Sequence, residues 1–163
     1  MVLRHRSVDL PAGVVAVNGF AVEMSRVFED FLTVVLTDAL ERIDGRVQAQ
    51  DRHGLDAERT VEMKPDLVWY RRGAPVAVVD AKYKIEHHGA PNADLYQMLA
   101  YCTALGLPEG HLVYAKGNDQ PAGVIVRNAG ITLHVHALDL DVPPAALLDQ
   151  ISDLAEVLRP PPR

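Results

Sequence analysis

The sequence lacks several features that would each point to a particular class of protein. It has one cysteine, Cys102, so no intrachain disulfide can form, as is usual in a reducing cytoplasm. Cys102 falls on the apolar side of a predicted helix, which favours a packed thiol over a nucleophile. No apolar run approaches the ~20 residues that a membrane-spanning helix needs, and residues 1–11 lack the apolar core of a signal peptide. We therefore expect a cytoplasmic protein.

Positive charge is also in short supply. The 163 residues include 16 Lys and Arg against 22 Asp and Glu, for a net charge of −6. A free-standing, high-affinity DNA-binding protein needs clustered Lys and Arg to neutralise phosphates. A nuclease of this composition would therefore approach DNA through metal ions or a partner. The length and the 48% content of hydrophobic residues predict a single soluble domain over residues 1–163.

The spacing of apolar residues predicts an α/β domain with a mixed sheet flanked by helices. An amphipathic helix is expected over Ala21–Ile43, ending at Asp44-Gly45 with the glycine in a left-handed conformation. A second helix is expected over Asn92–Leu105 and a C-terminal helix over Pro143–Leu158. Thr60–Met63 and Leu67–Tyr70 are expected to form one strand interrupted at Pro65. The predicted strands are Arg46–Gln50, Thr60–Met63, Leu67–Tyr70, Val76–Tyr83, His111–Ala115, Gly123–Val126 and Ile131–Ala137.

Two carboxylates and a lysine stand at the ends of two apolar runs that a short Gly/Pro connector joins. Asp66 precedes the first run, whereas Asp80 and Lys82 close the second and share one side of their strand. Mg²⁺ and Mn²⁺ prefer carboxylate oxygens and can promote phosphodiester hydrolysis. We therefore predict a metal site formed by Asp66, Asp80 and the backbone carbonyl of Ala81. Lys82 would orient the attacking water or stabilise charge on the phosphate.

Three other residues are candidates for the same site. Glu29 lies on the border of the apolar stripe of the first helix, where it is either a further metal ligand or an ordinary boundary residue. Gln97 and Tyr101 are four residues apart and share one face of the second helix. Gln97 can reach a phosphate, a metal-bound water or Lys82. Taken without family knowledge, this pair is more typical of a solvated glutamine and a half-buried tyrosine.

Basic and imidazole side chains follow the second acidic motif in the sequence. Lys84, His87 and His88 fall in a polar loop that would add positive charge over a substrate groove, although adjacent histidines in a loop usually face solvent. His134 and His136 alternate on one face of their strand, toward solvent or a helix.

The motifs together resemble the PD-(D/E)XK nuclease superfamily. Pro65-Asp66 matches the first half of its motif and Asp80-Ala81-Lys82 the second, with Glu29 and Gln97 at the accessory positions. A closer resemblance is to the nuclease domain of McrC-type subunits of McrBC modification-dependent restriction systems. It covers roughly residues 22–140 and is carried by three blocks, Lys64–Val68, Val79–Lys84 and Asp94–Tyr101.

This resemblance implies a restriction-endonuclease-like core with a central mixed sheet and Mg²⁺-dependent (or Mn²⁺-dependent) cleavage of DNA. Asp66 and Asp80 would bind the metal, Lys82 would serve the attacking water, and Glu29 and Gln97 would assist. A partner GTPase motor of the AAA+ class would recognise modified DNA and translocate it.

The residues themselves suggest contacts with substrate and leave other readings open. Tyr101 could donate to a phosphate or pack beside Lys82, Lys84 could lie over the substrate groove, and a homodimer would supply two active sites for cutting both strands. One alternative is a non-catalytic interaction module that keeps the nuclease fold. Another is a DNA repair or junction-resolving nuclease of the same superfamily.

Overall fold

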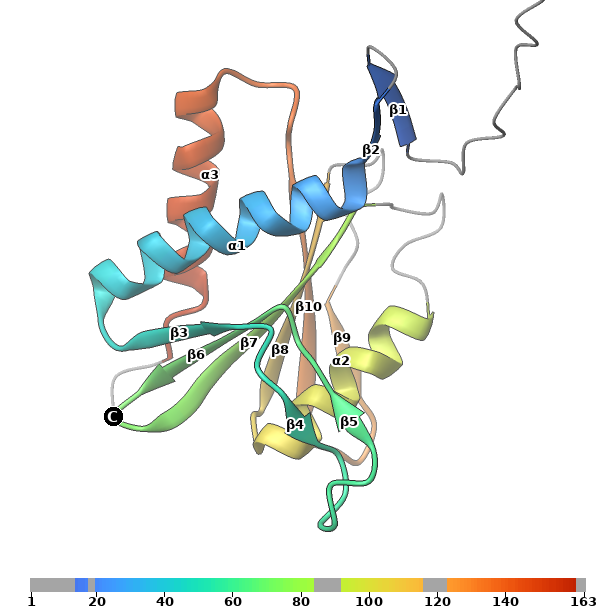
Figure 1. The fold of residues 1–163 in the computed structure, drawn as a ribbon. Coiled ribbons are helices and arrows are strands. Elements are labelled where there is room, and N and C mark those ends of the chain that lie inside the picture. Colours follow the sequence, from blue (N-terminus) through green and yellow to red (C-terminus); the bar gives the residue numbers. More distant parts are fainter. Residues whose placement is uncertain (1–13, 18–19, 84–91, 116–122, 161–163) are drawn as a thin grey trace, which may run out of the picture.

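A computed structural model of the protein describes residues 14–17, 20–83, 92–115 and 123–160. Within them the chain forms a mixed α/β structure (Figure 1). No helix in this part of the chain is long and apolar enough to cross a membrane. The elements are β1 (Val14–Val17), β2 (Phe20–Glu23), α1 (Met24–Ile43), β3 (Arg46–Ala49), β4 (His53–Gly54), β5 (Glu62–Met63), β6 (Leu67–Arg71), β7 (Ala74–Lys82), α2 (Asn92–Leu105), β8 (Glu109–Ala115), β9 (Val124–Val126), β10 (Ile131–Leu138) and α3 (Pro144–Val157).

A six-stranded sheet organises the molecule, with the strand order β3-β6-β7-β8-β10-β9. The pairs β7–β8 and β8–β10 are parallel, and the other neighbours are antiparallel. The sheet is therefore mixed, as the sequence predicted. The strand pairs β1–β2 and β4–β5 form two small sheets of their own.

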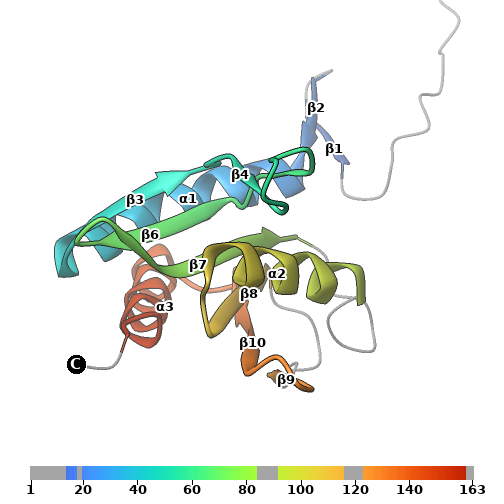
Figure 2. The same ribbon diagram turned by 90° about the horizontal axis from the view of Figure 1, so that it is seen from below.

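Alternating side chains on the strands build a separate core on each face of the sheet. Ala77 and Val79 of β7 pack with α1 and α3, whereas Val78, between them, packs with α2. The two helices α1 and α2 lie on opposite sides of β6 and β7 (Figure 2). On α1 the buried residues recur every four positions, which turns one stripe of the helix toward the sheet. These residues are Phe28, Leu32, Leu36 and Leu40.

Local physical chemistry accounts for where the elements differ from the predictions. Helix α1 begins at Met24 rather than Ala21, because Phe20–Glu23 pairs with β1 as a strand. The expectation of one interrupted strand over residues 60–70 is wrong, since β5 pairs with β4 outside the main sheet. Pro65 between β5 and β6 has no N–H to donate to a ladder. Gly45 ends α1 with φ +85°, as predicted.

Helix α2 packs unusually close to β8. A Cβ atom on Gly110 would collide with the sulfur atoms of Met98 and Cys102, so only glycine allows this approach. Cys102 is fully buried, and burial raises the pKa of its thiol to about 12. The thiol is therefore a packed group, as predicted, and the close contact fixes the helix that carries Gln97.

Candidate active site

The antiparallel pairing of β6 and β7 brings the two predicted acidic residues together. Leu67 pairs with Val79, so Asp66 and Asp80 lie next to each other at the end of the hairpin. The backbone N–H of Ala81 donates a hydrogen bond to Asp66 Oδ2 over 2.8 Å. Asp80 is only 3% exposed. The hairpin therefore holds two carboxyl groups side by side in a largely desolvated position.

Burial and mutual repulsion disfavour the ionised form of both carboxyl groups. The pKa of Asp66 is raised to about 8, first by burial and then by the charge of Asp80, and Glu29 adds to the repulsion. The hydrogen bond from Ala81 opposes this rise. Burial also raises the pKa of Asp80, although Lys82 acts in the opposite direction. A cation placed between these groups would relieve the repulsion.

Lys82 lies on the same side of β7 as Asp80 and is surrounded by acceptors. Its Nζ lies 2.5 Å from Asp80 Oδ2 and 3.7 Å from Asp94 Oδ1. It also donates a hydrogen bond to Gln97 Oε1 over 2.9 Å. Burial acts to lower the pKa of Lys82, but the carboxylates of Asp80, Asp94 and Asp66 outweigh it and raise the pKa. The amine is therefore held as a charged ammonium between β7 and α2.

A chain of hydrogen bonds on α2 supports Lys82. Gln97 Nε2 donates to the hydroxyl of Tyr101 over 2.7 Å, and that hydroxyl donates to the backbone carbonyl of Lys64 over 3.3 Å. Tyr101 is buried rather than half-buried, and burial followed by the charge of Asp80 raises its pKa to about 12. Gln97 is exposed, as expected, although it also accepts a hydrogen bond from Lys82, whereas the expectation of a half-buried Tyr101 is wrong.

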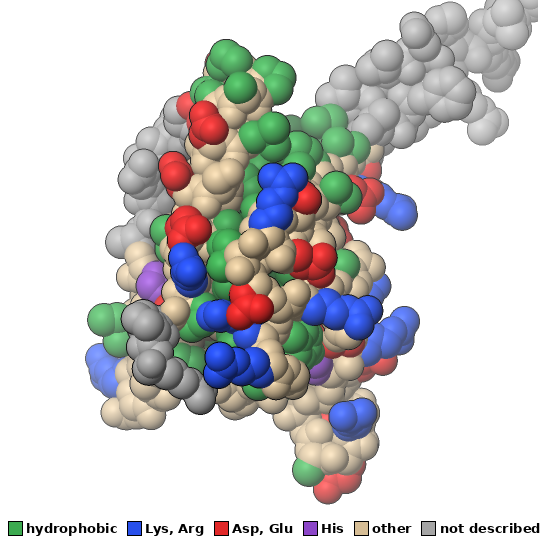
Figure 3. All heavy atoms as spheres, turned by 90° about the vertical axis from the view of Figure 1, so that its left-hand side faces the viewer, with side chains coloured by type: hydrophobic (Ala, Val, Ile, Leu, Met, Phe, Trp, Pro, Cys, Tyr) green, Lys and Arg blue, Asp and Glu red, His purple; other side chains and the backbone are tan. Residues whose placement is uncertain are grey.

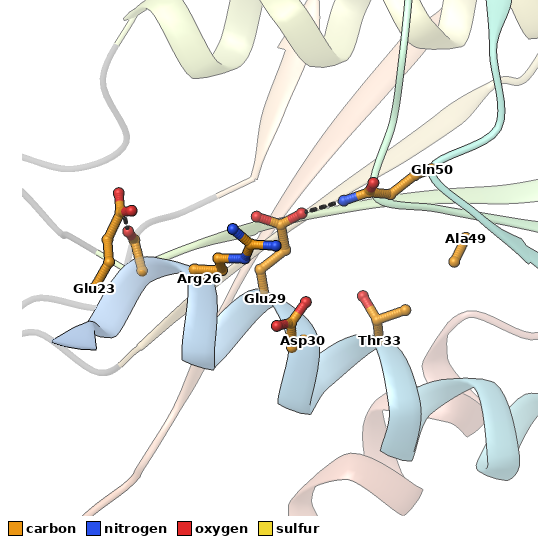
Figure 4. Close-up of a pocket in the computed structure, with 8 residues that line it drawn as sticks. Glu23, Arg26, Glu29, Asp30, Thr33, Ala49 and Gln50 are labelled. Atoms are coloured by element: carbon orange, nitrogen blue, oxygen red, sulfur yellow. Dashed lines mark hydrogen bonds between the residues drawn. The ribbon is translucent and has the colours of Figure 1, made fainter.

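Glu29 reaches the site from α1 on the other side of the hairpin. It is partly exposed and lines an open pocket of about 530 Å³ together with Arg26 and Asp30 (Figure 4). Gln50, at the end of β3, donates a hydrogen bond from Nε2 to Glu29 Oε1 over 2.7 Å. Glu29 is near enough to Asp66 that its charge contributes to the raised pKa of that carboxyl group.

The oxygen donors at the site suit a hard divalent cation. Across the described ranges, no three His, Cys, Asp or Glu side chains form a group that could hold a metal ion. Asp66 and Asp80 nevertheless supply adjacent carboxyl oxygens whose repulsion a cation would neutralise. The Ala81 carbonyl and Glu29 remain predicted further ligands. Lys84, predicted to contact substrate, lies outside the described residues, as do His87 and His88.

Sequence reasoning missed two groups at the site. Asp94, in the first turn of α2, lies beside Lys82 and accepts a hydrogen bond from the buried Tyr114 hydroxyl over 2.7 Å. Its position three residues before Gln97, on the same helix face, was the available signal. Gln50 stands at the end of the predicted strand Arg46–Gln50 and offers no signal, because its contact with Glu29 spans 21 residues of sequence.

Three histidines form a stack on the opposite face of the sheet. His111 shares a face of β8 with Val113, which packs against α1 and α3, and the rings of His134 and His136 lie beside it. Nδ1 of His111 and Nε2 of His136 are 3.1 Å apart. Burial and the neighbouring imidazoles lower the pKa of His111 to about 3, and burial and His134 lower that of His136 to about 4. Burial therefore disfavours the charged form of His111 and His136, while Nε2 of His134 lies 3.4 Å from Glu109 Oε2.

The comparisons with known proteins agree with this architecture. A chain of the refined half-complex from the tetradecameric assembly of Thermococcus gammatolerans McrB AAA+ hexamers with bound McrC has a similar fold, with a TM-score of 0.66 and 19% sequence identity. The similarity covers 85% of the present chain and 34% of that chain, so the present chain spans about a third of its length. No curated protein matches.

The family model named McrBC 5-methylcytosine restriction system component matches residues 1–115, which is most of the chain and includes the hairpin with Asp66, Asp80 and Lys82. This match confirms the resemblance to McrBC systems that the three sequence blocks indicated. The chain belongs to the family of McrBC 5-methylcytosine restriction system components.

Proposed function

We propose that this chain is a metal-dependent DNA endonuclease domain, the cleavage component of a McrBC-like restriction system. One observation carries the proposal: the convergence of Asp66, Asp80 and Lys82 at the end of a buried hairpin, with the lysine between carboxylates. Two adjacent carboxyl groups, one buried and one partly buried, are costly in a purely structural role, because each disfavours ionisation of the other. The arrangement has a chemical purpose if a divalent cation binds there.

A cation of the Mg²⁺ or Mn²⁺ class would be held by Asp66 and Asp80, with Glu29 and the Ala81 carbonyl as further oxygen donors. When bound, it supplies an activated water and neutralises charge on the phosphate. The raised pKa of Asp66 supports this assignment, since a bound cation restores the ionised form that burial disfavours.

The chain itself would orient the reacting groups. Lys82 presents a charged ammonium that can donate to a phosphate oxygen or to the attacking water. Gln97 restrains that ammonium, and Tyr101 in turn fixes the amide of Gln97 so that its oxygen faces Lys82. Because Tyr101 stays protonated at neutral pH, its hydroxyl remains a donor to the backbone of Lys64.

The surface supports dependence on a partner. On the face shown in Figure 3, acidic and basic side chains are interspersed rather than gathered into one basic patch. With a net charge of −6, such a surface attracts DNA weakly. The similar solved complex contains AAA+ hexamers with bound McrC. We therefore propose a GTPase motor of the AAA+ class as the partner that delivers modified DNA, and a pair of nuclease sites for cutting both strands.

The test is cleavage of 5-methylcytosine-containing and unmodified plasmid DNA with Mg²⁺ or Mn²⁺, with and without the AAA+ partner. Cleavage that needs the metal and disappears in Lys82→Ala is the expected result. Cleavage of branched DNA without regard to methylation would point instead to a repair or junction nuclease. Calorimetry that detects no binding of either metal, together with no cleavage, would point to a non-catalytic interaction module.

A further inference from the structure

Gln50 is hydrogen-bonded both to helix α1 and to the segment that precedes β6. Its side-chain amide donates to Glu29 Oε1 over 2.7 Å. Its backbone N–H donates to the carbonyl oxygen of Asp66 over 2.9 Å. One residue therefore ties an accessory carboxylate on α1 to the segment that carries a central carboxylate. Figure 4 shows the Gln50 amide directed at Glu29 across the pocket.

The backbone of Gln50 adopts a conformation that residues other than glycine rarely adopt. Its φ is +50°, in the left-handed region that normally favours Gly or Asn. This turn ends β3 and directs the chain away from the sheet, so the long side chain can point back toward α1. Glutamine has no intrinsic preference for this conformation. The choice of Gln here is better explained by what its amide reaches than by the turn.

The hydrogen bond orients a group that would otherwise move freely. Glu29 is partly exposed on a helix, and a glutamate in that position has several accessible rotamers. The amide of Gln50 is neutral and acts as a donor, so it can orient the carboxylate without neutralising it. Because Gln50 engages Oε1, the second oxygen of Glu29 can serve as a ligand toward Asp66. Outer partners of this kind commonly fix the orientation of metal-binding carboxylates.

We infer that Gln50 is a positioning residue that orients Glu29 toward the Asp66–Asp80 pair and thereby sets the affinity of the site for its divalent cation. The inference rests on the proposed function, since it assumes that Glu29 and the two aspartates hold a cation. Gln50 itself touches neither the cation nor the substrate in this scheme. Its loss would weaken cation binding more than it would slow cleavage at saturating metal.

Two substitutions separate the amide from the turn. Gln50→Met keeps the length of the side chain but removes the donor. Gln50→Asn keeps an amide and suits a positive φ, but it is one methylene too short to reach Glu29. If Gln50 acts only through its backbone, Asn should behave like the parent residue. If it acts through its amide, both variants should fail in the same way. Gln48→Met, in the exposed part of β3, is the matched control.

The measurement is Mn²⁺ affinity by calorimetry on the full chain, with metal-free thermal melts to verify folding. We expect both Gln50 variants to bind Mn²⁺ about 10-fold more weakly, at the lower end of what outer-sphere partners contribute, and Gln48→Met to bind like the parent. In the cleavage assay, both variants should require correspondingly more Mn²⁺ and regain most of the parent rate when it is saturating.

Unchanged Mn²⁺ affinity in either variant would overturn the inference while leaving the nuclease assignment in place. Loss of cleavage at saturating Mn²⁺ with unchanged affinity would likewise overturn it. If the parent chain binds no Mn²⁺, the nuclease assignment fails first and this inference fails with it. The parent measurement and the Lys82→Ala control therefore distinguish the two failures.

Discussion

The carboxylate site and the histidine stack lie on opposite faces of one sheet and differ in how burial affects their charge. At Asp66 and Asp80, burial raises the pKa values, while Lys82 provides a countercharge. In the stack of His111, His134 and His136, burial lowers the pKa values of the first and third rings, and the three rings stack on one another. The first arrangement places a charged lysine beside the acidic groups, whereas the second places imidazoles beside one another.

The two regions therefore respond to pH in opposite directions. A carboxyl whose folded-state pKa is raised retains a proton that the unfolded chain releases, so its contribution falls as pH rises. A histidine whose folded-state pKa is lowered must be deprotonated to fold, so its contribution falls as pH drops below about 6.5. In the metal-free protein these two windows overlap between about pH 4 and pH 6.5, where the two effects oppose each other, and above that range only the carboxyl effect continues, up to about pH 8.

The largest expected effect is a loss of cleavage when a carboxylate of the site is removed. Asp80→Asn removes a charge from the Asp66–Asp80 pair and should reduce metal-dependent cleavage by at least about 100-fold, as expected for loss of an electrostatic contact to the reacting groups. Asp38→Asn, which removes a carboxylate of an exposed pair with Arg42, is the control and should cleave normally. Normal cleavage by Asp80→Asn under saturating metal would contradict the proposed site.

The second prediction separates function from stability. Asp66→Asn should also lose activity, yet it should make the metal-free protein more stable, because it removes a carboxyl whose pKa rises from 3.8 to about 8 on folding. The gain should grow from pH 5 to pH 8 and reach several degrees in Tm, at about 2–4 °C per kcal/mol. Added Mg²⁺ should stabilise the parent and not the variant. A gain that is independent of pH would contradict this explanation.

The third prediction concerns the histidine face. Because the pKa values of His111 and His136 are about 3 and 4 in the folded protein, each should cost about 2 kcal/mol of stability on going from pH 7 to pH 5. His136→Gln should remove close to one proton from the slope of unfolding free energy against pH, measured by urea titration. His53→Gln, on the β4–β5 sheet, serves as the comparison and should leave most of that slope intact.

The smallest expected effect concerns the hydrogen bonds that hold Lys82 in place through Gln97 and Tyr101. Tyr101→Phe removes the hydroxyl between Gln97 and the Lys64 carbonyl but keeps the buried ring. We expect a few-fold decrease in cleavage and a loss of about 1 kcal/mol in unfolding free energy, the usual contribution of one hydrogen bond. A loss of cleavage as large as that of Asp80→Asn would mean that Tyr101 contacts the substrate directly.

Local patterns made much of the fold and the centre of the site predictable. Helix α2 spans Asn92–Leu105, as predicted. Asp80 and Lys82 could be placed on one side of their strand from the period of two alone. Asp66 could be placed next to them because a short Gly/Pro connector implies an antiparallel hairpin, which fixes the register.

The contacts that could not be predicted join residues that are distant in the sequence. The hydrogen bonds Tyr114–Asp94, Gln50–Glu29 and His111–His136 span 20, 21 and 25 residues. Each depends on how a strand or helix packs against another element, and no local pattern encodes this. The start of α1 was missed for a related reason, since pairing with β1 decides that Phe20–Glu23 forms a strand.

The β-bulge between Trp69 and Tyr70 has a practical consequence for engineering. The pairing of β6 with β7 is regular from Leu67 to Trp69. Beyond the bulge, toward the tip at Arg72 and Gly73, the register is shifted by one residue. The bulge thus separates the tip from the Asp66–Asp80 end, so a change in loop length can be absorbed without turning either aspartate to the other face. A fluorophore or affinity label inserted at Arg72-Gly73 should therefore report on assembly while the site stays intact.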